Sequence, residues 1–241
     1  MPPFGVHNLI FSKNYAIIYI EKMRKEIKVM THNIATIANM FEDIVASIRT
    51  PEMDAFMADP NHVTWHRLSM TTRDSLGSVS FASGCTRCVI IKEGCPYVFK
   101  IQFDFDDDID YGRNEAWVYN KAKEAHLEQY FAWTAKIGTY GKAEVYAMEY
   151  CEVNMDKIED ESFKYHAQRY QEEYGEDYDG DDYGGHEGMF EFAVSVDGAD
   201  IVAVEQLLYD LDVNDCHAGN WGYRGDLLVL TDYAGYLPQD N

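Results

Sequence analysis

Residues 214–220 read Asn-Asp-Cys-His-Ala-Gly-Asn, and residues 230–235 read Leu-Thr-Asp-Tyr-Ala-Gly. Between these two stretches the sequence predicts a β-hairpin. Its strands are Trp221–Tyr223 and Leu227–Leu230, and the Arg-Gly-Asp tripeptide that joins them has the composition of a tight turn. Because a hairpin returns the chain to the point where it started, we expect the two quoted stretches to lie side by side.

Three polar residues in these stretches have the spacing of a phosphoryl-transfer site. Asn220 follows Asp215 by five residues, and Asp232 comes after the hairpin. Phosphoryl transfer requires one carboxylate that orients the attacking hydroxyl, and oxygen ligands for the Mg²⁺ that neutralises the phosphates. The spacing therefore predicts that Asp215 orients the nucleophile and that Asn220 and Asp232 bind the metal. The alternative is an ordinary structural role, since Asp and Asn are also common in turns and caps.

This pattern resembles the catalytic loop and metal-binding segment of the protein kinase-like superfamily. The signature of that superfamily is His-Arg-Asp-x-x-x-x-Asn followed by Asp-Phe-Gly, and Asp215, Asn220 and Asp232 stand at its functional positions. The chain departs from the signature at Val213–Asn214, which replaces His-Arg, and its glycine after the second Asp comes one residue late. His217 occupies a position where many Ser/Thr kinases carry Lys. The resemblance implies that His217 lies near the transferred phosphoryl group and offsets charge there.

A stretch upstream resembles the loop that covers the phosphates in kinases. Residues 76–83 read Leu-Gly-Ser-Val-Ser-Phe-Ala-Ser, where the kinase form is Leu-Gly-x-Gly-x-Phe-Gly, so that Val79 and Ala82 replace two glycines. Glycine lets backbone N–H groups approach phosphates closely, and its loss should weaken or reshape nucleotide binding. A plain strand and turn is the alternative for this stretch. The resemblance implies that the following residues bind the nucleotide: Gly77, Ser78, Ser80 and Phe81.

A lysine and a glutamate follow in the order that the kinase fold requires. The strand Tyr97–Ile101 resembles the Val-Ala-Ile-Lys strand whose lysine contacts the α- and β-phosphates, which points to Lys100. The segment Asn114–Ala122 reads as a helix, and its Glu115 is placed to be the ion-pair partner of Lys100. Glu124, further along the same helix, is the fallback partner. The alternative for Lys100 is a solvent-facing position on a half-buried strand.

Two further strands are predicted near Phe131–Thr139 and Ala143–Tyr150. The second ends in a Met-Glu-Tyr-Cys-Glu run that resembles the kinase hinge, which binds adenine through backbone groups. The resemblance implies a nucleotide-binding role for three residues of this run, the first of which guards the pocket: Met148, Glu149 and Cys151. ATP and Mg²⁺ are the cofactors that these motifs together imply.

The motifs occur in the kinase order between Leu76 and Gly235, and the resemblance implies an α+β, protein kinase-like fold of two lobes. Residues 70–152 are expected to form the β-rich small lobe. Residues 153–241 are expected to form a minimal, truncated helical lobe, because few residues follow the second metal ligand. Residues 1–69 are expected to be an N-terminal extension that is mostly helical from about residue 30. This organisation and the Asp-x-His-x-Gly-Asn loop are similar to the compact early-gene Ser/Thr protein kinase of short-tailed lytic phages.

Apolar residues recur with helical spacing along the N-terminal extension. The following residues share one helix face: Ile34, Ile37, Met40, Phe41, Ile44 and Ile48. A second short helix is predicted near Glu52–Met57, and we expect both helices to pack on the small lobe. The segment Met1–Val29 differs in carrying a net charge of +3, from five Lys or Arg and two Glu, and Met30 is a candidate for the natural start.

Acidic residues dominate the composition, with 42 Asp and Glu against 20 Lys and Arg and a net charge of −22. Such a charge disfavours nonspecific binding to nucleic acid or to an anionic membrane and permits binding to basic proteins. The acidic residues are densest between 172 and 187, at the end of a polar helix predicted over Met155–Tyr174. Like charges at this density favour a solvated loop. An apolar stripe after it predicts one more helix: Ile201, Val204, Leu208 and Leu211.

The five cysteines are odd in number and follow no regular framework, which suggests free thiols in a reducing compartment. We therefore expect a cytoplasmic protein. Cys85, Cys88 and Cys95 are also candidate ligands of a zinc site, for which the nearby sequence offers no clear fourth ligand.

The family resemblance implies an ATP- and Mg²⁺-dependent Ser/Thr protein kinase, phage-encoded, that phosphorylates host proteins of the transcription or RNA-processing machinery. The acidic surface predicts basic protein substrates rather than nucleic acid or membrane. The alternative is a kinase-fold protein with weak or no catalysis, whose acidic surface binds and inhibits a basic nucleic-acid-binding protein of the host. The missing loop glycines and the short second lobe favour this alternative. The sequence leaves the oligomeric state open.

Overall fold

The computed structural model describes the following residues: 32–60, 78–83, 87–102, 110–175, 177–178, 180, 185–198, 200–213 and 215–234. The chain divides into two compact units, residues 1–33 and 34–241. Of the first unit, only His32 and Asn33 are described. Several sequence predictions fall outside the described residues, namely those on Met30, Gly77, Cys85 and Gly235.

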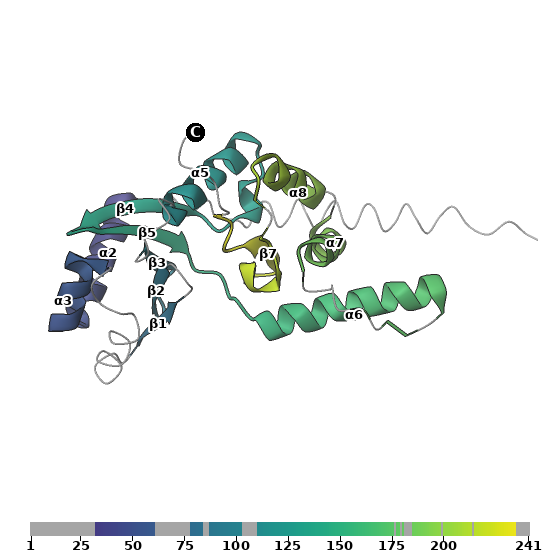
Figure 1. Cartoon of the computed structure of the whole chain (residues 1–241), viewed down its shortest axis with the longest axis horizontal. Helices are drawn as coiled ribbons and strands as arrows, with labels where there is room; N and C mark the ends of the chain where they lie inside the picture. Colours follow the sequence, from purple (N-terminus) through teal and green to yellow (C-terminus); the bar gives the residue numbers. More distant parts are fainter. Residues whose placement is uncertain are drawn as a thin grey trace, which may run out of the picture. The chain divides into compact units, whose positions relative to one another are not determined.

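Five antiparallel strands form the main sheet of the second unit, in the order β1-β2-β3-β5-β4 (Figure 1). The strands are β1 (Val79–Ser83), β2 (Arg87–Lys92), β3 (Tyr97–Gln102), β4 (Thr134–Tyr140) and β5 (Ala143–Glu149). Short connections suffice between antiparallel neighbours. The connection from β3 to β4 is longer and contains helix α5 (Tyr111–Glu124).

Helices α2 (Ile34–Ser47) and α3 (Pro51–Ala58) cover one face of the sheet and form a hydrophobic core with it. Both helices and the strands contribute to this core: Ile37, Phe41, Ile44, Met53, Phe56, Cys88, Ile90, Phe99 and Ile101. The helical spacing predicted from the sequence is confirmed, except that Ile34 and Met40 lie at the exposed edge of the helix face. Thr50 caps α3, because its Oγ1 accepts a hydrogen bond of 3.1 Å from the N–H three residues on.

Helix α5 packs on the opposite face of the sheet from α2 and α3. Asp110 caps this helix, since its Oδ1 accepts a hydrogen bond of 2.9 Å from the Arg113 N–H. The helix begins at Tyr111, three residues before the predicted start. Its approach to the sheet is close at Gly112, where a Cβ atom would lie 2.3 Å from a ring carbon of Tyr146 on β5. The glycine therefore sets how near α5 comes to the strands.

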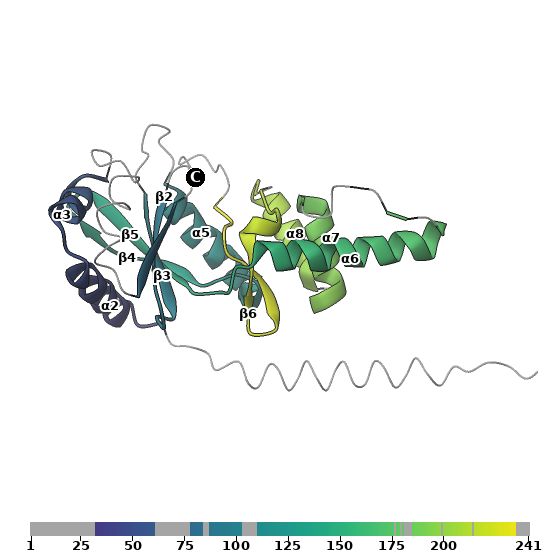
Figure 2. The ribbon, with the colours of Figure 1, turned by 90° about the horizontal axis from the view of Figure 1, so that it is seen from below.

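A second hydrophobic core joins α5 to the C-terminal elements (Figure 2). These elements are α6 (Met155–Tyr174), α7 (His186–Asp197), α8 (Asp200–Asp210), β6 (Trp221–Arg224) and β7 (Leu227–Leu230). The predicted hairpin and the predicted helix α6 are both confirmed. Trp221 is fully buried, and its indole N–H donates a hydrogen bond of 3.0 Å to the Cys216 C=O. The chain is therefore a mixed α+β protein.

The segment 172–187, predicted to be a solvated loop, has helical residues at both of its ends. Helix α6 runs through its first residues, and helix α7, which the sequence does not predict, begins at His186. Between them the Tyr178 ring packs against Phe163 and Tyr170 of α6, with ring centroids 5.9 Å and 5.6 Å apart. These aromatic contacts hold the Tyr178 ring against helix α6, although the surrounding segment is strongly negative.

Candidate active site

A buried ion pair joins the sheet to helix α5. Lys100 Nζ on β3 lies 2.7 Å from Glu115 Oε1 and donates a second hydrogen bond of 3.0 Å to the Thr231 C=O. The side chain of Glu115 is 0% exposed and that of Lys100 is 8% exposed, so a solvent-facing lysine is excluded. The expected pair is present. The fallback partner Glu124 is exposed and binds Lys121 at 2.9 Å instead.

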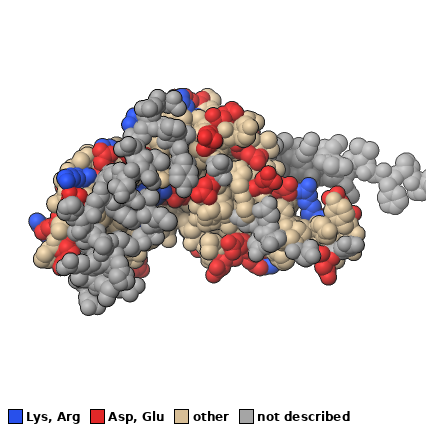
Figure 3. Space-filling model, viewed as in Figure 1, with Lys and Arg blue, Asp and Glu red and all other residues tan. Residues whose placement is uncertain are grey.

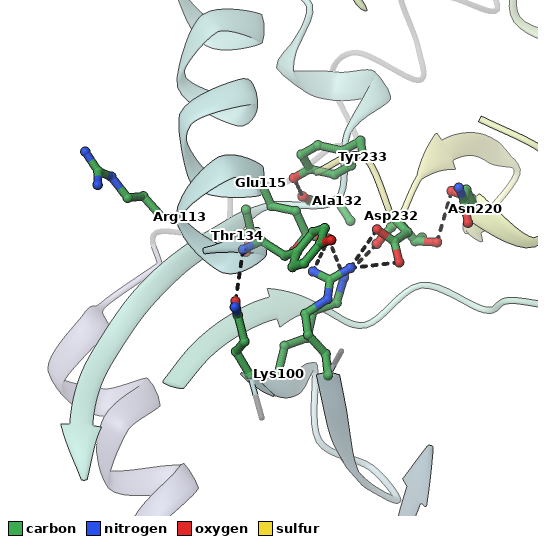
Figure 4. Close-up of polar contacts among 12 residues, drawn as sticks. Lys100, Arg113, Glu115, Ala132, Thr134, Asn220, Asp232 and Tyr233 are labelled. Atoms are coloured by element: carbon green, nitrogen blue, oxygen red, sulfur yellow. Dashed lines mark hydrogen bonds and ion pairs between the residues drawn. The ribbon is translucent and has the colours of Figure 1, made fainter. Parts of the chain in front are cut away.

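Arg87, which the sequence pattern does not single out, extends this pair into a cluster of four charges. Its Nη2 donates hydrogen bonds of 2.8 Å and 2.9 Å to the two carboxylate oxygens of Asp232. Its Nη1 lies 2.8 Å from Glu115 Oε1, an ion-pair contact without the alignment of a hydrogen bond. Figure 4 labels three of the charged residues of this group, Lys100, Glu115 and Asp232. We call Arg87, Lys100, Glu115 and Asp232 the ionic cluster; two cations and two carboxylates balance within it.

The strand register explains how Arg87 reaches the cluster. Arg87 pairs with Gln102, and Val89 pairs with Lys100, so Arg87 and Lys100 share one face of the sheet. Arg87 and Asp232 are 145 residues apart. The alternation of side chains along β2 leaves two possible faces for Arg87. The β2–β3 register decides between them, and the sequence does not give that register in advance.

The charges of the cluster stabilise one another. Burial raises the pKa of Asp232, but the charges of Lys100 and Arg87 outweigh it and lower that pKa to about 2. Burial lowers the pKa of the Arg87 guanidinium, whereas Glu115 and Asp232 raise it above its ordinary value. The Asp232 side chain is 45% exposed, so solvent screens part of this attraction and an entering cation can reach the carboxylate.

The loop before β6 brings Asp215 and Asn220 together with the end of the hairpin. The side-chain amide of Asn220 donates a hydrogen bond to the Asp215 C=O. The Asn220 C=O accepts hydrogen bonds from the N–H groups of Thr231, at 2.7 Å, and Asp232, at 3.3 Å. The hairpin therefore returns Asp232 to Asn220, as the sequence predicts.

The ring of His217 is oriented by the same loop. Its Nδ1 accepts a hydrogen bond of 3.1 Å from the Gly219 N–H, so the neutral ring carries its proton on Nε2. This Nε2 lies 3.8 Å from Asp215 Oδ1. The side chains of His217 and Asp215 are 53% and 61% exposed, so both are accessible to a second molecule.

Asn220 and Asp232 provide the kind of ligands that Mg²⁺ prefers, an amide oxygen and a carboxylate. The amide nitrogen of Asn220 is engaged by Asp215, which leaves the amide oxygen as the ligand atom. Among the described residues, no group of three or more His, Cys, Asp or Glu side chains could enclose a metal, and Cys88 and Cys95 belong to no such group. A cation held by these two residues would have to take its remaining ligands from phosphates and water.

The residues predicted to form a hinge, 148–152, lie at the end of β5 and directly after it. Met148 is buried on the face of the sheet that carries the ionic cluster. The N–H groups of Glu149 and Tyr150 donate to carbonyls beside the sheet, at 2.8 Å and 2.9 Å, and Glu152 exchanges two hydrogen bonds with β6. Cys151 lies between them, and within the described part of the chain its N–H and C=O make no backbone hydrogen bond.

The structure places strand β1 where the sequence suggests a phosphate-covering loop. Ser78 lies at the end of the β1–β2 ladder that is remote from the ionic cluster. Ser80 lies on the face of the cluster, whereas Phe81 lies on the opposite face and packs in the core of α2 and α3. The β1–β2 connection at residues 84–86 is outside the described residues, as is Gly77. Of Ser78, Ser80 and Phe81, the residues of this set that the structure describes, Ser80 lies on the face of Lys100.

No protein-family model, curated protein or solved structure matches the chain. None of the helices in the described residues combines the length and the apolar character that a bilayer crossing needs. The geometry of the ionic cluster and of the loop before β6 is therefore the basis for assigning a function.

Proposed function

We propose that this chain is an ATP- and Mg²⁺-dependent protein kinase that phosphorylates serine or threonine hydroxyls. The observation that carries the proposal is the buried Lys100–Glu115 pair, which lies against the hairpin that holds Asn220 and Asp232. Segments far apart in the sequence meet in one region. They supply a buried cation, its carboxylate partner and two residues of the kind that bind Mg²⁺. This combination on an antiparallel sheet supports a protein kinase-like fold with a small second lobe.

Each residue has a distinct role in the proposed transfer. Lys100 is the cation for the α- and β-phosphates, and Glu115 fixes its ammonium group. Asn220 and Asp232 would hold Mg²⁺, which neutralises phosphate charge when it is bound. Asp215, exposed on the loop, orients the substrate hydroxyl for attack.

His217 supports Asp215 in this scheme. Its Nε2–H faces the Asp215 carboxylate at 3.8 Å. This Nε2–H is also a donor that could reach an oxygen of the transferred phosphoryl group and offset negative charge there.

Basic proteins are the proposed substrates. Figure 3 shows carboxylates spread over the face that it draws, with few Lys or Arg side chains among them. The formal net charge is −22, and a charge of this size raises the rate of encounter with cationic partners. Together with the resemblance to the phage early-gene kinase, this charge supports host proteins as substrates and the host cytoplasm as the place of action.

Nucleotide binding tests the proposal directly. Titration calorimetry with a non-hydrolysable ATP analogue and Mg²⁺ should detect one site in the wild type. Asp232→Asn should weaken binding by at least about tenfold, because the metal loses its charged ligand. Asp226→Asn, an exposed change in the turn of the same hairpin, should bind as the wild type does. Absence of binding to the wild type would contradict the proposal.

Binding without catalysis is a second candidate function, favoured by a surface hollow between α6, α7 and α8. Four apolar or aromatic side chains line it together with carboxylates: Tyr165, Phe190, Val194 and Val202, with Glu187, Glu191 and Glu205. Arg169 also lines it and pairs with Glu191 at 2.7 Å, so the lining keeps a net negative charge. A basic segment with apolar residues would complement such a surface.

Two variants separate this candidate from the kinase. Glu187→Lys combined with Glu205→Lys should abolish binding of a basic partner and leave phosphoryl transfer to a short peptide unchanged. Asp215→Asn should do the reverse. Capture of a basic host protein that survives Asp215→Asn, weakens with salt and accompanies no transfer would favour the binding function.

A further inference from the structure

The guanidinium of Arg87 is buried, and not all of its N–H donors make hydrogen bonds. Its side chain is 10% exposed, and a single nitrogen, Nη2, makes both hydrogen bonds to Asp232. This is not the two-nitrogen fork with which arginine usually binds a carboxylate. The other terminal nitrogen, Nη1, is buried and makes no hydrogen bond within the described residues, although Glu115 lies 2.8 Å away. Arg87 therefore retains hydrogen-bonding capacity in the interior of the cluster.

The two carboxylates of the cluster depend on Arg87 to different degrees. Glu115 is held by Lys100 at 2.7 Å and keeps a cation without Arg87. Among the described residues, Asp232 has its only direct ion pair with Arg87. A divalent cation that binds Asp232 would thus replace Arg87 at this carboxylate.

Replacement at Asp232 would leave two buried cations, Arg87 and Lys100, with the single carboxylate of Glu115, so the cluster would lack one anion. An uncompensated charge in such a position is costly. The phosphates that accompany the metal supply that anion, and a guanidinium is well suited to phosphate oxygens. Arg87 lies on the same face of the sheet as Lys100, the proposed phosphate ligand, and starts the strand that follows the β1–β2 connection.

We propose that Arg87 is a second phosphate-binding residue of the site, which pairs with Asp232 in this structure and moves to the phosphates when metal and nucleotide enter together. This inference rests on the proposed kinase function. In the free protein Arg87 occupies the metal ligand, so metal alone binds weakly. The metal–nucleotide complex binds well because it brings both a cation for Asp232 and an anion for Arg87.

A purely structural role of Arg87 predicts different binding results. If Arg87 only stabilised the folded chain, its removal would weaken every ligand or none. If Arg87 exchanges Asp232 for phosphate, its removal strengthens metal binding in the absence of nucleotide and weakens nucleotide binding. The opposite signs of these two changes are the signature of the exchange.

The test compares wild type, Arg87→Gln and Asp232→Asn in two binding measurements. Free Mn²⁺, followed by electron paramagnetic resonance without nucleotide, reports metal affinity; Asp232→Asn defines the binding to other acidic groups that must be subtracted. Calorimetry with Mg²⁺ and the non-hydrolysable ATP analogue reports nucleotide affinity. Arg87→Gln should bind Mn²⁺ roughly tenfold more tightly and the nucleotide roughly tenfold less tightly, as loss of one nearby charge predicts.

Two further variants keep the test decisive. Arg113→Gln is the matched control, because Arg113 is exposed on α5 and points away from Asp232 in Figure 4; it should change neither affinity. If circular dichroism shows that Arg87→Gln does not fold, Arg87→Lys replaces it. Lysine keeps a cation for Asp232 but offers phosphate a poorer partner, so Mn²⁺ affinity should stay near the wild type while nucleotide affinity falls.

The outcomes separate the inference from the proposed function. A wild type that binds no nucleotide overturns both. A wild type that binds nucleotide, with Arg87 variants that bind it equally well or lose affinity for Mn²⁺ and nucleotide alike, overturns the inference and leaves the kinase proposal standing.

Discussion

Arg224 of β6 binds Glu149 at the end of β5 through two hydrogen bonds, of 2.9 Å and 2.6 Å. The same guanidinium donates to the carbonyls of Gln129 and Phe131, at 2.9 Å and 2.7 Å. One side chain therefore joins the hairpin beside the proposed metal ligands to the end of β5 and to the segment before β4. Glu149 is important here for its side chain, whereas the family resemblance points to its backbone.

Loss of this connection should destabilise the protein. Arg224→Met removes a half-buried charge and leaves Glu149, 14% exposed, without its cation. We expect the free energy of unfolding to fall by about 3 kcal/mol, as for other buried pairs that lose one partner. Urea denaturation measures this value. Arg49→Met breaks an exposed pair with Asp54 and should change it by less than about 0.5 kcal/mol.

Replacing Lys100 should affect both folding and ligand binding. Lys100→Met leaves Glu115 with Arg87 as its remaining cation, so we expect a loss of about 3 kcal/mol, near the lower end for a broken buried pair. Nucleotide affinity should be lost as well. Lys136→Met is the matched control, because Lys136 is an exposed strand lysine paired with Glu144 at 2.6 Å. A Lys100→Met protein that binds nucleotide normally would exclude Lys100 as the phosphate ligand.

Gly112 should tolerate no side chain although it lies in a helix. In a typical helix Gly→Ala stabilises by up to about 1 kcal/mol. In α5 the new methyl group would meet the Tyr146 ring, 2.3 Å away, so we expect destabilisation by about 1–3 kcal/mol. Denaturation of Gly112→Ala, alone and with Tyr146→Ala, forms a double-mutant cycle. Equal effects in both backgrounds would show that the ring contact is not the cause.

Stability should depend on pH through Asp197. Burial raises the pKa of this carboxyl to about 6, in spite of a hydrogen bond from the Leu228 N–H, which lowers it. Between pH 3.8 and about 6 the folded protein keeps a proton that the unfolded chain has lost, so this group makes the free energy of unfolding fall as pH rises.

Asp197→Asn tests this dependence, because Asn retains an oxygen acceptor for Leu228. The variant should be more stable than the wild type at pH 8 and equally stable at pH 4, as measured by urea denaturation. Asp226→Asn, exposed in the turn between β6 and β7, is the control. A variant that is less stable at pH 8 would mean that the charged form of Asp197 is favoured in the folded protein.

Local patterns in the sequence predict much of this fold. Alternation and turn residues predict β4, β5 and the β6–β7 hairpin, and helical spacing predicts the buried face of α2. The pairing of Lys100 with Glu115 is also predicted, but from the kinase resemblance and the order of its motifs. Local sequence patterns alone do not predict a contact between residues on different elements.

Long-range contacts account for what the sequence does not predict. Arg87 reaches Asp232 across 145 residues, through a strand register that composition does not encode. Helix α7 begins within an acidic segment because its apolar residues enter a core built by α6, α8 and β7. Phe81, expected at the nucleotide, faces the core of α2 and α3, since a strand rather than a loop occupies this position.

Phosphoryl transfer is the most direct test of the central claim. Labelled γ-phosphate from Mg·ATP would be followed into the protein itself and into a heat-inactivated host-cell lysate, with wild type, Asp215→Asn and Asp212→Asn. Asp212 is exposed in the turn after α8, with a φ of 56° that Asn also tolerates, and serves as the matched control. We predict labelled proteins with the wild type and Asp212→Asn, and loss of label with Asp215→Asn. No label with the folded wild type, or equal label with Asp215→Asn, would contradict the kinase assignment.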